Sequence, residues 1–156
     1  FADGDGRTFR AVLLRNVVTI GTLTTLAAVA LFVLAGTLVE VLLGGGKFTA
    51  EDVATTSLVV AAFALSIPFD ALAYPLSRGL YATHDTLRQV IASFAGLGVV
   101  IVSSQLLEPT AGILAIPFGY AAGMLAKDVL LAVFLAARVR RIGRDLGGAA
   151  VSPPAP

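Results

Sequence analysis

Long stretches without a charged residue constrain this chain more than any other feature of its sequence. Arg15 and Glu40 are separated by 24 uncharged residues, and Arg88 and Glu108 are separated by 19. Stretches of 17 and 18 uncharged residues follow Asp52 and Glu108. A hydrocarbon layer about 30 Å thick is crossed by roughly 20 helical residues. These stretches therefore predict helices that span a membrane.

We expect an all-α fold, namely a polytopic membrane helix bundle with four transmembrane helices. A soluble bundle would carry a polar stripe along each helix, and a membrane β-barrel would alternate apolar and polar residues. The uncharged stretches show neither pattern. We expect residues 1–146 to form the transmembrane region and the Gly-, Ala- and Pro-rich residues 147–156 to be a disordered tail. The predicted spans are about residues 16–43, 53–80, 88–107 and 110–137.

Residues that favour helix ends lie between these spans. Residues 44–46 are three consecutive glycines, which favour the end of the first helix. Thr49 with Asp52 predicts a capping box at the start of the second span, and residues 86–89 (Thr-Leu-Arg-Gln) predict another at the start of the third. The link at 109–110 (Pro-Thr) is very short. The last two spans are therefore expected to form an antiparallel hairpin.

Basic residues are concentrated on one side of the predicted bundle. Hydrophobic residues make up 57% of the chain and charged residues 13%, with a net charge of +1, so we expect no nucleic-acid partner. The positive-inside rule places the arginine-rich side, and with it both ends of the chain, in the cytoplasm. These arginines also favour contact with membrane lipids. That side carries Arg7, Arg10, Arg15, Arg78, Arg88, Arg138, Arg140, Arg141 and Arg144, whereas Lys47 lies on the other side among Glu40, Glu51, Asp52 and Glu108.

Asp70 is the most informative polar residue of the predicted spans. It lies near the middle of the second span, where a carboxylate costs about 2.5–3.5 kcal/mol on insertion scales. Pro68 and Pro75 flank it and are expected to kink or break the helix, because proline clashes with the carbonyl four residues earlier. Tyr74 and Arg78 follow at four-residue spacing on the same face. The strip is either a substrate contact or gate, or a structural ion pair or water-exposed notch.

Lys127 and Asp128 are further candidates for the substrate path or its gate, in the last span. Adjacent helical residues point about 100° apart, so these two pair poorly with each other. The second and fourth spans run in the same direction, which places Lys127 at a depth similar to that of Asp70. One hypothesis is that Lys127 and Asp70 form an ion pair across the bundle. The alternative is that the span ends near Ala126 and that Lys127 extends to the lipid headgroups.

Small residues predict close packing between helices. Gly119 and Gly123 form a GxxxG pattern in the last span, and Ala92 and Gly96 have the same spacing in the third. Small residues allow helix backbones to approach closely in lipid. Pro117, just before the pattern, is expected to kink the last span.

The residue inventory excludes several kinds of chemistry. The chain has no cysteine and a single histidine, His84, which excludes thiol chemistry and multi-histidine metal sites. It contains no hydrolase, phosphate-loop or metalloprotease signature. We therefore expect no enzyme activity, no cofactor and no metal site.

The order of several short motifs resembles that of a known family. The motifs are residues 46–48 (Gly-Lys-Phe), 63–68 (Phe-Ala-Leu-Ser-Ile-Pro), 78–82 (Arg-Gly-Leu-Tyr-Ala) and 85–86 (Asp-Thr). Together they resemble the bacterial lipid II flippases of the MurJ/MviN type, over about residues 10–142. The residues that match the family pattern are Pro68, Arg78, Tyr81 and Asp85.

The resemblance implies the fold of the multidrug/oligosaccharidyl-lipid/polysaccharide exporter superfamily. It implies transport of lipid II, the lipid-linked peptidoglycan precursor, across the bacterial cytoplasmic (inner) membrane by alternating access, for cell wall biogenesis and cell shape. The chain would then be a C-terminal-half fragment that packs against the remaining helices of the parent transporter. Two alternatives stay open: an exporter of another polyprenyl-linked saccharide, and a small membrane scaffold that does not transport.

Overall fold

The computed structural model describes the backbone of residues 5–82 and 85–149, and the side chains of residues 8, 11–82 and 85–141. Within these residues all regular structure is helical, which confirms the predicted all-α fold. The elements are α1 (Asp5–Leu43), α2 (Ala50–Ala64), α3 (Ile67–Ala82), α4 (Thr86–Ala111), the 3₁₀ turn η1 (Gly112–Leu114) and α5 (Ala115–Ala149).

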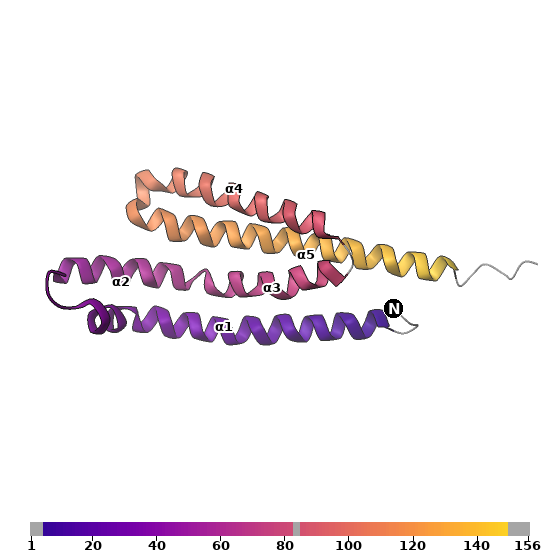
Figure 1. Ribbon diagram of the computed structural model, residues 1–156, viewed down its shortest axis with the longest axis horizontal. Helices are drawn as coiled ribbons and strands as arrows, with labels where there is room; N and C mark the ends of the chain where they lie inside the picture. The colour runs from indigo at the N-terminus through magenta and orange to yellow at the C-terminus, as the bar shows by residue number, and fades with distance from the viewer. Residues whose placement is uncertain (1–4, 83–84, 150–156) are drawn as a thin grey trace, which may run out of the picture.

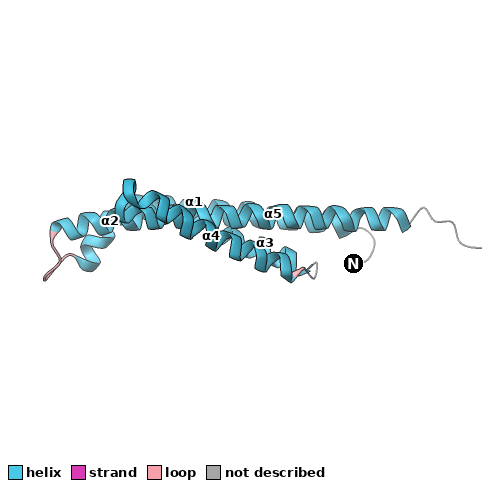
Figure 2. Cartoon of the chain, turned by 90° about the horizontal axis from the view of Figure 1, so that it is seen from above, coloured by secondary structure: helices cyan, strands magenta, loops and turns pink. Residues whose placement is uncertain are grey.

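The helices lie side by side in one thin layer. Figure 1 shows the order across the layer as α1, then α2 and α3 in one row, then α5 and α4. Contacts follow this order, because α1 packs against α2 and α3, α3 packs against α5, and α5 packs against α4. Figure 2 shows how thin the layer is from above. Every helix therefore keeps exposed surface, and most of the exposed large side chains are aliphatic or aromatic.

Three helical stretches of the described residues are long and apolar enough to cross a membrane, where the sequence predicted four. They are Ala11–Leu43, Ala50–Ala82 and Thr86–Arg141. The count of four is therefore not confirmed. The difference lies in the third stretch, which is 56 residues long and contains both α4 and α5. This stretch reverses direction at η1, so α4 and α5 pack against each other (Figure 1).

The second stretch is broken between α2 and α3. Leu65 and Ser66 lie in a turn between the two helices. The break follows from Pro68, whose ring clashes with the carbonyl of the residue four positions earlier, where α2 ends at Ala64. The break lies just before Asp70 rather than around it, and Pro75 sits inside α3 without interrupting it.

The loop between α1 and α2 has the helix end and the capping box that the sequence predicted. α1 ends at Leu43, directly before the three glycines, and Gly46 has φ +65°, a conformation that favours glycine. The capping box at the start of α2 is confirmed. The Thr49 hydroxyl accepts from the backbone N–H of Asp52 at 3.2 Å, and the Thr49 backbone N–H donates to the Asp52 carboxylate at 2.8 Å.

The predicted start of the third span and the predicted turn before the last helix are both wrong. The last helix also extends further than expected. The predicted second capping box is absent, because Thr86 is already helical and the N-cap residue is Asp85, which makes no side-chain cap bond. The α4–α5 turn lies at Gly112 rather than at 109–110, since Pro109 stays inside α4 and Gly112 takes φ +54°. α5 continues to Ala149, so the first residues of the expected tail are helical, and residues 150–156 lie outside the described residues.

Small residues bring α4 and α5 together. A Cβ atom added to Gly119 would lie 2.9 Å from the backbone nitrogen of Ser104, and one added to Gly123 would lie 2.7 Å from the carbonyl oxygen of Gly96. Real Cβ atoms do not approach backbone atoms so closely, so both contacts require glycine. Pro117 is the third residue of α5, where the first turn accommodates proline. The buried core between α3, α4 and α5 consists of Ala73, Leu80, Ala92, Leu131 and Leu135.

Candidate functional site

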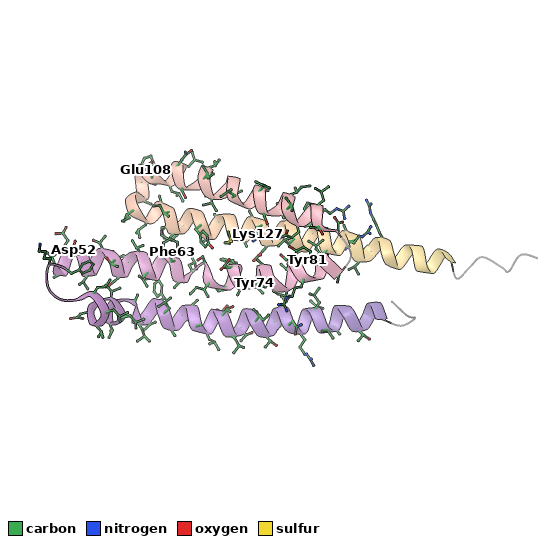
Figure 3. The ribbon with its side chains drawn as sticks, viewed as in Figure 1. Asp52, Phe63, Tyr74, Tyr81, Glu108 and Lys127 are labelled. Atoms are coloured by element: carbon green, nitrogen blue, oxygen red, sulfur yellow. The ribbon has the colours of Figure 1, made fainter. Side chains whose placement is uncertain are left out.

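A polar strip, formed by Asp70, Tyr74 and Arg78, runs along the exposed face of α3. All three residues are exposed, and Tyr74 is 68% exposed. Buried residues of α3, including Ala73 and Leu80, lie on its other side. The four-residue spacing explains this division, because it keeps the polar residues on one face of the helix. Figure 3 marks Tyr74 within this helix.

The exposed surfaces of the neighbouring helices have a different character. Phe118, Leu125 and Val129 are exposed on α5, and Phe94 and Leu106 are exposed on α4. Such side chains suit contact with hydrocarbon, whereas charged side chains at this depth are costly. The polar strip of α3 is therefore suited to water or to a polar ligand.

Asp128 is buried, although it belongs to the same candidate group. It is 7% exposed, and neither carboxylate oxygen has a hydrogen-bond partner among the described residues. Asp70, on the neighbouring helix α3, is close enough to interact with it electrostatically. A buried carboxylate without a donor is unfavourable. The packing around Asp128, rather than its own hydrogen bonds, therefore holds it in place.

Tyr120 joins Asp70 and Asp128, and we name these three residues the acidic cluster. The Tyr120 hydroxyl interacts with the Asp70 carboxylate and, electrostatically, with Tyr74. Its ring contacts Phe63 of α2, with ring centroids 6.0 Å apart and planes tilted by 59°. The sequence analysis missed Tyr120. Its spacing of eight residues from Asp128 leaves the two side chains about 80° apart around α5, so the sequence spacing gave no clear signal for it.

Lys127 does not pair with Asp70 in this structure. A Cβ atom added to Gly96 of α4 would lie 2.9 Å from the Cβ of Lys127, so Lys127 faces α4. Among the described side chains, the recorded ion pair joins Arg88 and Asp85, and none joins Lys127 and Asp70. α5 also continues well past Ala126, so the helix does not end there. The angle of about 100° between adjacent residues turns Asp128 toward α3 and Lys127 toward α4.

A groove of about 240 Å³ lies between α1 and α3, beside the polar strip. Asn16 of α1 and Tyr74 and Arg78 of α3 contribute its polar groups. Asn16 was not singled out from the sequence, because a lone amide at the start of an apolar stretch carries no motif. Its apolar walls are formed by Val12, Leu13, Ile20 and Pro75, with Gly79 completing the lining.

A comparison with protein families decides the family. Residues 1–150 match the family described as lipid II flippase MurJ. The chain belongs to this family. No curated protein and no solved structure matches the chain significantly. Membership connects these apolar helices with lipid II transport and peptidoglycan biosynthesis, and MurJ proteins are lipid transporters rather than enzymes.

The residues that match the MurJ pattern in the sequence lie along α3 and the start of α4. Tyr81 is exposed near the end of α3 (Figure 3). Asp85 pairs with Arg88 at 2.8 Å, and the Arg88 guanidinium lies 5.9 Å from the centre of the Phe134 ring on α5. The ring contact joins the start of α4 to α5, and the local ion pair with Asp85 holds Arg88 at the start of α4, which indicates a structural role for Asp85.

The two ends of the layer differ in charge. Figure 3 shows Asp52 and Glu108 at one end of the layer. By their positions along α1, α3, α4 and α5, the other end carries Arg15, Arg78, Arg88 and the arginines between 138 and 141. The side chains of Arg7, Arg10, Arg144 and His84 lie outside the described residues. Within the described part of the chain, no three His, Cys, Asp or Glu side chains group as a metal site.

Proposed function

We propose that this chain forms part of a flippase that moves lipid II across the bacterial cytoplasmic membrane by alternating access. Two observations support the proposal: the MurJ match over residues 1–150 and the three long apolar stretches. The partners are then membrane lipids, the polyprenyl-linked substrate and further helices of the transporter.

The proposed topology has four crossings, with both ends of the chain in the cytoplasm. At about 1.5 Å per residue, the 56 residues of the third stretch are far too long for one crossing of about 30 Å. The reversal at η1 supports two crossings, one by α4 and one by α5. The separation of arginines from acidic residues supports a cytoplasmic location for the arginine-rich end.

The main structural support for a role in transport is the polar strip of α3. An Asp and an Arg facing hydrocarbon would each cost about 2.5–3.5 kcal/mol on insertion scales. A surface that exposes both is stable where it meets water or other protein. We infer that the strip lines the substrate path, and that the acidic cluster, which shares Asp70 with it, lies where α3 and α5 would move against each other. The α2–α3 break beside it supports this, because broken helices are common at transporter binding sites.

A translocation assay tests this function. The flippase that contains this chain is reconstituted in proteoliposomes with fluorescent lipid II, and transfer between leaflets is followed. Replacing Asp70 by Leu should slow transfer about tenfold, the equivalent of about 1.4 kcal/mol at the transition state. Glu108→Gln, an exposed acid at the other end of the layer, serves as the matched control and should transfer at the wild-type rate. Wild-type protein that transfers no lipid II, or prefers another polyprenyl-linked saccharide, would contradict the proposal.

A further inference from the structure

We propose that the groove between α1 and α3 binds the diphosphate and first sugar of a polyprenyl-linked saccharide. Arg78 and Asn16 would bind the phosphate oxygens, and Tyr74 and Asp70 would bind sugar hydroxyls. This inference rests on the proposed function, because it gives the transported lipid a contact site on this chain.

The free groups of the groove support a phosphate ligand. Arg78 and Asn16 make no hydrogen bond or ion pair with any side chain that the structure describes. An arginine guanidinium is a fork of N–H donors that matches phosphate oxygens in pairs. The Asn16 amide adds donors from the opposite wall of the groove, on α1. The groove thus offers unused donors on two sides of one space.

The order of groups along α3 matches the order of groups in such a lipid. Arg78, Tyr74 and Asp70 follow one another at intervals of one helical turn, which is about 5.4 Å. The cation is suited to the diphosphate, and the tyrosine and the carboxylate are suited to hydroxyl groups of a sugar. Asp70 also repels a phosphate group, so the charge gradient along the strip favours one orientation of the ligand.

The apolar walls and position of the groove support a lipid over a soluble phosphate. Val12, Leu13, Ile20 and Pro75 surround the polar groups. Arg15 precedes Asn16 in the chain and lies at the same, arginine-rich end of the layer. A ligand with a negative headgroup and a hydrocarbon chain fits these surroundings. The polar strip, which we propose lines the substrate path, borders the groove. We therefore favour the transported substrate over a phospholipid as the occupant of the groove.

Binding measured in nanodiscs tests the proposal without requiring transport. The full chain is placed in phosphatidylcholine nanodiscs and titrated with undecaprenyl diphosphate, with or without an attached saccharide. Arg78→Gln should weaken binding of both probes roughly tenfold, the effect of losing one charge-assisted hydrogen-bonded contact. Asp70→Asn should weaken only the probe that carries the saccharide. Arg140→Gln, an exposed arginine of α5 outside the groove, is the matched control and should bind both probes normally.

The inference would be overturned if Arg78→Gln bound the probes as tightly as the wild type does. It would also be overturned if Arg78→Gln and Arg140→Gln weakened binding by the same factor. Displacement of the probe by equimolar phosphatidylglycerol would assign the groove to phospholipids instead and would also overturn it. The outcome is separable from that of the translocation assay. A flippase that translocates lipid II but binds normally after Arg78→Gln retains its proposed function and loses only this site. A wild-type flippase without translocation contradicts the function itself.

Discussion

At the scale of single residues, the buried carboxylate of Asp128 is the least favourable feature of the described structure. Both of its oxygens lack a hydrogen-bond donor, and Asp70 adds a second carboxylate nearby. Burial opposes the ionised carboxylate, and the adjacent Lys127 offsets only part of that cost, whereas a neutral group of the same shape avoids most of it. Asp128 therefore belongs to the residues that are kept at the expense of stability, which is common where side chains serve function.

Replacing Asp128 by Asn should raise the thermal midpoint of the protein in detergent by a few degrees. The amide keeps the shape of the side chain and cannot ionise, so less charge is buried, and a gain of about 1 kcal/mol corresponds to roughly 2–4 °C for a chain of this size. The midpoint can be followed by circular dichroism of the helices. Glu108→Gln is the control, since that acid is exposed near the end of α4 and the midpoint should stay unchanged. A lower midpoint for Asp128→Asn would mean that the carboxylate has a stabilising partner.

At the scale of elements, the contact between α4 and α5 depends on glycine. Replacing Gly123 by Val should lower stability by about 1–3 kcal/mol, the usual cost of overpacking a tight interface. The added atoms would meet the carbonyl oxygen of Gly96 at 2.7 Å and the backbone nitrogen of Val100 at 3.0 Å. Gly98→Val on α4 is the matched control, because a Cβ atom there meets nothing within 4 Å. Similar midpoints for the two variants would show that α4 and α5 do not pack through Gly123.

The start of α2 offers a second test at this scale. Thr49→Ala removes the hydroxyl that accepts from the Asp52 backbone N–H, and such a change costs about 1 kcal/mol. Hydrogen exchange should therefore speed up in the first turn of α2. Thr55→Ala, an exposed residue inside the same helix, should leave that turn unchanged. Equal exchange in both variants would show that the capping box does not stabilise the helix end.

At the scale of the whole molecule, the proposed topology of four crossings makes a clear prediction for surface labelling. The chain contains no cysteine, so single cysteines can be introduced without background. Lys47→Cys and Glu108→Cys should react with a membrane-impermeant thiol reagent applied from outside the cell. Arg15→Cys and Arg140→Cys should react only after the membrane is opened. External labelling of Arg140→Cys with protection of Arg15→Cys would instead mean an odd number of crossings.

The sequence by itself determined the helical, membrane-spanning character of this protein, because a charge-free stretch of about 20 residues satisfies its backbone only as a helix in lipid. It also predicted the first loop, where three glycines and the Thr49–Asp52 pair act locally. Only the tertiary structure decided the lateral order of the helices and the turn at Gly112. It also decided that Asp128, rather than Lys127, lies close to Asp70. The physical reason is that packing between helices sets their rotation, whereas hydropathy is nearly the same on all sides of an apolar helix.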